Sequence, residues 1–125
     1  MAIQNLLFIG IGGFIGSISR YACSYYLNRW LHTLYPWGTF AVNITGCFIL
    51  GFILGLTEHH QVSERWRFFL AAGFCGSFTT FSTFAAEGIG LYEKDLTFLS
   101  FIYLAGSVVT GILMAWTGMW VGRQI

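Results

Sequence analysis

Glycine and hydroxyl residues interrupt an apolar segment in the second half of the chain. The segment from Phe68 to Ala86 has no Asp, Glu, Lys or Arg, and a helix of this length, at about 1.5 Å per residue, crosses a hydrocarbon core of roughly 30 Å. Within it, Gly76 permits non-helical backbone, and the hydroxyl residues that follow can satisfy freed backbone groups. The pattern predicts a membrane helix broken near the bilayer midplane. Such a break usually lines an ion or substrate site.

Phenylalanines alternate with hydroxyl residues in this segment. Phe78, Phe81 and Phe84 are spaced three apart, which is ordinarily the spacing of a packing stripe. The alternative is a pathway for a small, hard anion, because an aromatic ring carries partial positive charge at its edge and because conduction requires weak, successive sites. The hydroxyl residues that lie between the rings are Thr79, Thr80, Ser82 and Thr83.

An amide side chain lies in an earlier apolar segment. Thr39, Asn43 and Gly46 share one helical stripe, since positions three and four apart lie on one face. An unsatisfied amide in hydrocarbon is costly. One interpretation is a hydrogen bond to a neighbouring helix, and the other is an N–H donor that faces an anion pathway.

Two charged residues lie at the ends of apolar segments. Arg20 ends the first charge-free segment, where its guanidinium can extend to the membrane interface. Glu87 directly follows the segment that ends at Ala86. Its carboxylate is interpreted either as an interfacial group or as a partner for Arg20.

Composition places the whole chain in a membrane. Hydrophobic residues make up 56% and charged residues 9%, with a mean hydropathy of +0.69, whereas a soluble surface needs about 25% charged residues. Four charge-free segments predict one all-α integral membrane domain over 1–125, embedded in lipid, with a first helix that is retained rather than cleaved. The net charge of +1 excludes nucleic acid as a favoured partner. The helices are expected at about 3–31, 38–57, 66–92 and 96–122.

Topological charges nearly cancel. Four passes place Arg65, Arg67 and Arg123 on one side, and Arg29 and Lys94 on the other, where Arg20 adds a further charge if it lies near that end. The two sides therefore differ too little in Lys and Arg for the positive-inside rule to predict one orientation. Insertion in both orientations, with two copies packed antiparallel, and a single orientation set by other factors both stay open.

Small residues recur at a spacing of four on three of the expected helices. This spacing lets helices approach closely, either within one chain or between chains. The pairs are Gly12 with Gly16, Gly51 with Gly55, and Gly118 with Gly122.

Together these residues resemble the Fluc family of fluoride channels, also called CrcB, over essentially the whole chain. The resemblance rests on four motifs, one in each expected helix and in the same order. They are Gly12-Gly13-x-x-Gly16-x-x-x-Arg20-Tyr21, Gly38-Thr39-x-x-Val42-Asn43-x-x-Gly46, Gly73-Phe-Cys-Gly76-x-Phe78-Thr79-Thr80-Phe81-Ser82-Thr83-Phe84-x-x-Glu87, and Tyr103-x-x-Gly106-Ser107. Ser77 stands where the family usually has a second glycine, and Ser17 where it usually has alanine.

The resemblance implies a passive, fluoride-selective channel in the prokaryotic plasma membrane. It implies an antiparallel dual-topology homodimer with two pores and a central structural sodium ion, held by the backbone carbonyls of Gly76 and Thr79 from both subunits. It implies that Arg20 lies at the vestibule and Asn43 beneath it. The fluoride pore residues expected are Phe81, Phe84, Asn43, Thr39, Ser82, Thr83, Tyr103, Ser107 and Thr110.

Other classes of protein fit the sequence less well. A dual-topology, proton-coupled small-molecule exporter of the small multidrug type also has four helices, but its mechanism needs a carboxylate deep in the first helix, and residues 3–31 contain none. A purely structural membrane protein would not need the hydroxyl-rich interruption. An enzyme is not expected, because no nucleophile and base pair or metal-ligand cluster is visible.

Overall fold

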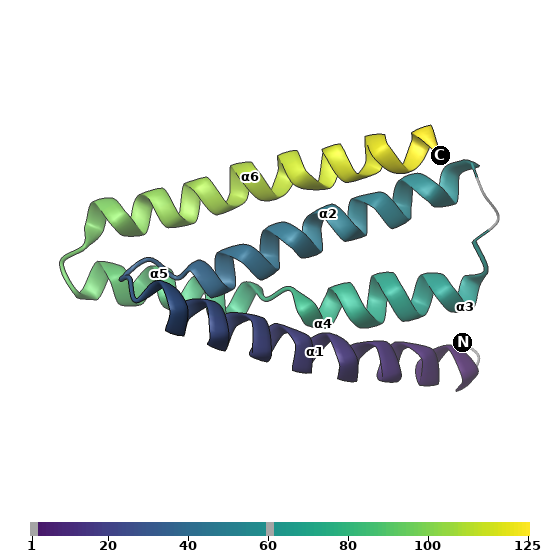
Figure 1. Ribbon diagram of the computed structural model, residues 1–125, viewed down its shortest axis with the longest axis horizontal. Helices are drawn as coiled ribbons and strands as arrows, with labels where there is room; N and C mark the ends of the chain where they lie inside the picture. Colours follow the sequence, from purple (N-terminus) through teal and green to yellow (C-terminus); the bar gives the residue numbers. More distant parts are fainter. Residues whose placement is uncertain (1–2, 60–61) are drawn as a thin grey trace.

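The chain folds into four long helical spans that run back and forth along one axis (Figure 1). The computed structural model describes residues 3–59 and 62–125, which contain helices and no strand. The first span is α1 (Ile3–Leu31), the second is α2 (Trp37–His59) and the fourth is α6 (Thr97–Gln124). The third span is divided into α3 (Glu64–Arg67), a π-helix η1 (Phe68–Cys75), α4 (Gly76–Phe78) and α5 (Phe81–Glu93).

All four spans are long and apolar enough to cross a membrane, which confirms the predicted number of spanning helices. The expected bounds coincide with α1 and differ from the other spans by one or two residues at each end. The structure adds the π-helix, which the sequence analysis did not predict. A π-helix inside a longer helix often lies next to a functional site.

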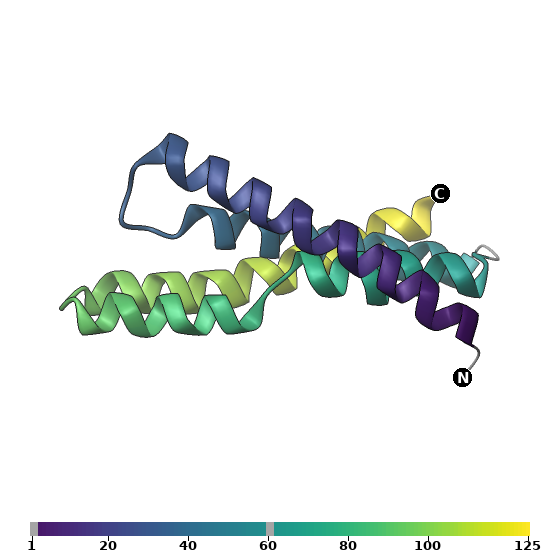
Figure 2. The same ribbon diagram turned by 90° about the horizontal axis from the view of Figure 1, so that it is seen from below.

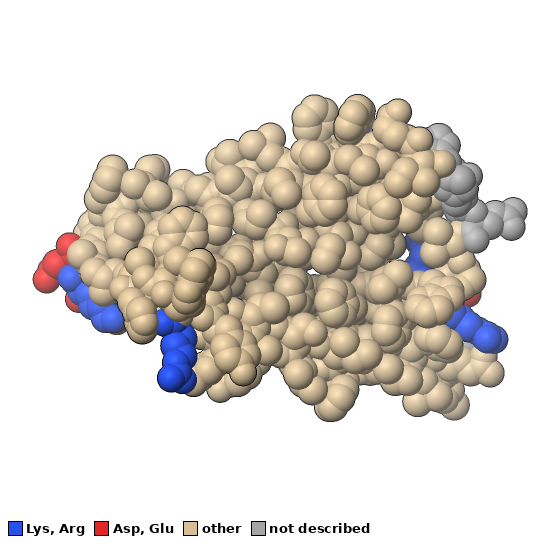
Figure 3. Space-filling model, viewed as in Figure 1, with Lys and Arg blue, Asp and Glu red and all other residues tan. Residues whose placement is uncertain are grey.

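On the face shown in Figure 3, the charged residues gather towards the two ends of the molecule, and the surface between them is almost entirely uncharged. The start of α1, the end of α2, the start of α3 and the end of α6 share one end (Figure 1). At this end, Arg123 and Glu58 form an ion pair at 2.6 Å. This distribution is the one expected of a protein whose middle lies in hydrocarbon.

Glycines on α2 and α6 let these two helices pack backbone to backbone. A Cβ added at Gly51 or Gly55 would overlap the α6 carbonyl oxygens of Ala115 or Met119, and one added at Gly118 would overlap the carbonyl of Phe48 on α2. We call this contact the α2–α6 seam. Two of the predicted glycine pairs therefore act within one chain.

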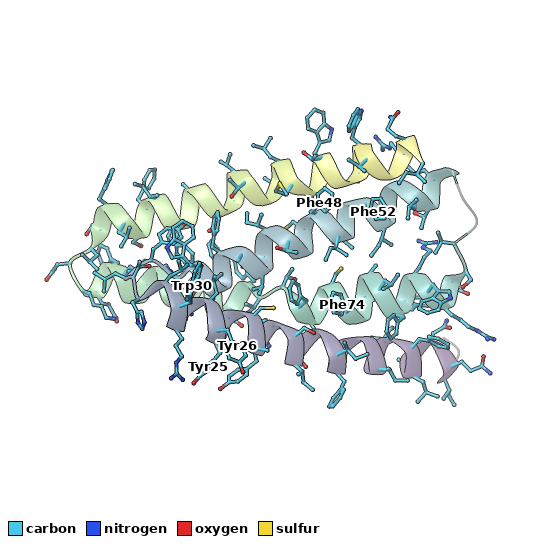
Figure 4. The ribbon with its side chains drawn as sticks, viewed as in Figure 1. Tyr25, Tyr26, Trp30, Phe48, Phe52 and Phe74 are labelled. Carbon is cyan, nitrogen blue, oxygen red and sulfur yellow. The ribbon has the colours of Figure 1, made fainter. Side chains whose placement is uncertain are left out.

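The third glycine pair lies on α1 and contacts the π-helix. A Cβ at Gly12 would overlap the carbonyl oxygen of Phe69, and one at Gly16 would overlap that of Phe74. The wider turns of η1 thus approach α1 most closely where α1 has no side chain. Beyond this contact α1 diverges from α5 and α6 (Figure 2), and Tyr25, Tyr26 and Trp30 lie near its C-terminal end (Figure 4).

Candidate ion pathway

The third span loses helical geometry at two threonines. Thr79 has φ −84° and ψ 158°, and Thr80 has φ −148° and ψ 119°, so both are extended between α4 and α5. Gly76, which the sequence analysis expected to permit non-helical backbone, is itself helical with φ −61° and ψ −29°. β-Branched threonine suits extended backbone better than helix. The non-helical residues therefore lie after the glycine, not at it.

The side-chain amide of Asn43 on α2 hydrogen-bonds to the extended backbone through both its oxygen and its nitrogen. Its Oδ1 accepts from the Thr80 N–H at 2.7 Å, and its Nδ2 donates to the Thr80 carbonyl at 3.1 Å. The interhelical hydrogen bond that the sequence analysis considered is thus present. Because an amide nitrogen carries two N–H groups, the pair with Thr80 leaves Asn43 one further donor.

Two backbone N–H groups at the break do not donate to the carbonyls that would accept from them in an unbroken α-helix. In a regular helix the Thr80 N–H would donate to the Gly76 carbonyl and the Thr83 N–H to the Thr79 carbonyl. Instead, the Thr80 N–H donates to Asn43, and the Thr83 N–H donates to the Thr80 Oγ1 at 3.2 Å. The Gly76 and Thr79 carbonyls lose the donors that helical geometry would supply.

A groove of about 430 Å³ lies beside the break. The residues that line it come from α2, the third span and α6, and the predicted site residues among them are Asn43, Gly76, Thr79, Phe81, Phe84 and Ser107. The groove therefore collects the amide, both predicted carbonyl donors to sodium and both predicted pore phenylalanines.

Aromatic rings form a row that leads from the groove into the core. The rings of Phe81 and Phe84 lie 5.7 Å apart between centroids, and those of Phe84 and Tyr103 lie 5.3 Å apart. Phe81 is 79% exposed, whereas Phe84 is 9% exposed and Tyr103 is fully buried. We call these three rings the aromatic row.

Two predicted polar residues hydrogen-bond to the same carboxylate. The sequence analysis did not predict that this carboxylate belongs to the site. The Thr39 hydroxyl donates to Glu87 Oε1 at 2.8 Å, and the Tyr103 hydroxyl donates to Glu87 Oε2 at 2.7 Å. Neither contact involves Arg20, and among the described residues no ion pair joins Arg20 to Glu87. The spacing could have indicated this placement, because Glu87 lies three residues after Phe84 and so falls on the same helical face.

The remaining predicted residues lie outside the lining of the groove. The hydroxyls of Ser82 and Thr83 gather around the Thr80 Oγ1, which caps the N-terminus of α5. The Thr110 hydroxyl donates to the Gly106 carbonyl of its own helix. Arg20 is partly buried, and within residues 3–59 and 62–125 its Nε finds no hydrogen-bond partner.

Comparisons with known proteins show the family of this chain. The family described as CrcB-like protein, Camphor Resistance (CrcB) matches residues 7–119. The chain is 43% identical over 121 residues to the fluoride-specific ion channel FluC of Phocaeicola vulgatus, covering 97% of this chain and 100% of the relative. It is 44% identical over 115 residues to the channel of the same name from Chlorobium phaeobacteroides (91% and 89%), and 35% identical over 124 residues to that from Flavobacterium psychrophilum (98% and 100%). The chain therefore belongs to the CrcB family.

Proposed function

We propose that this protein is a passive, fluoride-selective ion channel of the prokaryotic plasma membrane. The observation that carries the proposal is the aromatic row, which starts at the groove beside the Asn43 amide and ends at Tyr103. The relatives that share the family are named as channels rather than enzymes. The chain is a multi-pass membrane protein by its four spans.

Fluoride would pass along neutral groups. The edges of Phe81 and Phe84 offer partial positive charge, and Asn43 offers the N–H that its pairing with Thr80 leaves. Ser107 also lines the groove. Because no single group carries a full charge, each site holds the ion weakly enough to release it to the next.

The functional unit that we propose is an antiparallel, dual-topology homodimer with two pores. Phe81 is 79% exposed on the single chain, and the groove is open beside it, so a second copy would cover both. The charges at the two ends of the molecule support insertion in both orientations, because they differ by at most one Lys or Arg. A closed two-fold pair repeats the same groove on both subunits.

We further propose a structural sodium ion at the two-fold axis. Gly76 and Thr79 both line the groove, and the Thr80 and Thr83 N–H groups that would bond to their carbonyls in a helix donate elsewhere. In hydrocarbon an unsatisfied carbonyl costs several kcal/mol, and four such oxygens from two subunits suit a hard cation. No carboxylate belongs to this set, which favours a monovalent ion. When bound, sodium would compensate these oxygens and hold the two breaks together.

The test is fluoride efflux from liposomes that contain the purified protein. Passive conduction predicts that fluoride leaves down its gradient without a proton gradient and that chloride barely moves under the same conditions. Equal chloride flux, or fluoride movement that requires a proton gradient, would overturn the proposal. The second result would favour the proton-coupled exporter instead.

A further inference from the structure

Gly13 on α1 contacts the third span through a side chain, whereas Gly12 and Gly16 contact backbone atoms. A Cβ added at Gly13 would lie 3.0 Å from the Ser77 Oγ and 3.9 Å from the Gly73 carbonyl oxygen. Because Gly13 has no Cβ, the Ser77 side chain occupies this space. Ser77 therefore packs directly on the bare face of α1.

This contact lies immediately before the break. Ser77 belongs to α4 and lies two residues before the extended Thr79. It follows Gly73 by four residues and so lies on the same helical face. At Gly73 the two backbones are already close, since a Cβ there would lie 2.7 Å from the Ile9 carbonyl oxygen. The contact with α1 thus continues from η1 to the edge of the break, and the glycine that the family usually has at Ser77 would have no side chain to extend it.

The packing of Ser77 bears on the Gly76 carbonyl. Gly76 has no side chain to hold its backbone, and a Cβ added there would have only the Ala71 carbonyl oxygen within 4 Å, at 3.8 Å. The Gly76 carbonyl belongs to the planar peptide unit that ends at the Ser77 Cα. On the other side of Gly76, Cys75 is 1% exposed. The orientation of this carbonyl therefore depends on how Cys75 and Ser77 are packed.

We propose that Ser77 is a positioning residue for the sodium site, because its contact with Gly13 fixes the peptide unit that carries the Gly76 carbonyl. A carbonyl that is held in advance loses less freedom when the ion binds, so the ion binds more tightly. In this way α1 supports the site, although none of its described residues lines the groove. The inference rests on the proposed sodium ion and names the contact that sets its affinity.

Ser77→Gly tests this role because it removes the contact. The melting temperature of the purified protein is measured over a series of sodium concentrations, with a bulky organic cation keeping the ionic strength constant. These values give the sodium concentration of half-maximal stabilisation. We expect this midpoint to rise about fourfold in S77G, equivalent to roughly 0.8 kcal/mol for one packed CH₂ group. Fluoride efflux at saturating sodium should stay unchanged, because the proposed ligands are backbone atoms.

Two further variants separate the contact from the flexibility of glycine. Ala72→Gly puts a glycine at an exposed position of the same span, so it should lower the melting temperature without moving the sodium midpoint. Gly13→Ala combined with S77G moves the side chain from the third span to α1. Its new Cβ would lie 3.9 Å from the Gly73 carbonyl oxygen, which is an ordinary contact distance. We expect this double variant to return the midpoint towards that of the wild type.

The outcomes distinguish the contact from the ion and from the channel. An unchanged midpoint in S77G, or a raised midpoint that A72G shares or that the double variant does not restore, would overturn the inference. Ser77 would then affect stability alone. A wild-type melting temperature that does not depend on sodium would overturn the proposed ion and this inference with it. Because melting does not require conduction, a wild type that releases no fluoride would overturn the proposed channel only.

Discussion

The α2–α6 seam and the interrupted third span both contain glycines, but only the third span loses helical geometry. In the seam, Gly51 and Gly118 bring two backbones together while both helices remain continuous. In the third span, Thr79 and Thr80 leave helical geometry, and Asn43 from another helix takes up the freed backbone groups. Small residues alone thus indicate close packing. A polar group supplied by a second helix distinguishes the candidate site.

Asn43→Asp should have the largest effect on fluoride efflux. The carboxylate removes the donor to the Thr80 carbonyl and places a negative charge beside the anion path. We expect fluoride efflux to fall by at least about a hundredfold, equivalent to roughly 3 kcal/mol. The dimer should still elute as a dimer on size exclusion. Efflux close to that of the wild type would show that Asn43 serves packing alone.

Phe81→Ile and Phe84→Ile test the aromatic row. Isoleucine keeps apolar bulk but has no positive ring edge, so each change should lower fluoride efflux about tenfold or more. Phe98→Ile provides a matched control, because Phe98 is 76% exposed on α6 and belongs to no ring contact of the row. If the control and the row variants conduct equally, the row is a packing feature.

Exchange of sodium for a bulky organic cation tests the carbonyl cage. Fluoride efflux should decline after long exchange, because the Gly76 and Thr79 oxygens would lose the cation bound to them. It should return when sodium is restored. Thr79→Ala is a useful control: the Thr79 hydroxyl donates to the Cys75 carbonyl at 2.9 Å, so its removal leaves the proposed backbone ligands in place. Full efflux after complete exchange would argue that no ion is needed.

A substitution in the seam should affect stability rather than selectivity. The added methyl of Gly118→Ala would meet the Phe48 carbonyl and destabilise the fold by about 1 to 3 kcal/mol. Gly10→Ala, whose Cβ would meet nothing within 4 Å, should melt as the wild type does. The folded fraction of G118A should still exclude chloride. Chloride leak in this variant would mean that the seam also shapes the pore.

Thr110→Val should have the smallest effect. The Thr110 hydroxyl donates to the Gly106 carbonyl in its own helix. We therefore expect the fluoride efflux of T110V to remain unchanged, whereas that of Ser107→Ala should fall. A loss in T110V as large as that in S107A would place this hydroxyl on the ion path, as the sequence resemblance implied.

The sequence predicted the spans more fully than the details of the site. Charge-free segments give four helices because burial in hydrocarbon is a property of each segment by itself. The predicted break around Gly76 to Thr79 contains the extended Thr79, but the extended Thr80 is hydrogen-bonded to Asn43, which lies in another span. The π-helix likewise packs against another span, on the face of α1 that Gly12 and Gly16 leave without side chains. Partners across spans cannot be read from spacing along one span.

Glu87 illustrates the same limit within the site. Its position in the sequence allowed an interfacial carboxylate or a partner for Arg20, whereas the structure pairs it with Thr39 and Tyr103. All three of these hydrogen-bonding residues had been noted individually. Which of them meet is decided by the packing of α2, α5 and α6.

The reversal potential of currents across a planar bilayer tests the central claim most directly. With fluoride and chloride gradients set in opposite directions and no proton gradient, a passive fluoride channel must pass current that reverses at the fluoride equilibrium potential. We predict that value for the wild type. Reversal at the chloride potential, or no current until a proton gradient is imposed, would contradict the account.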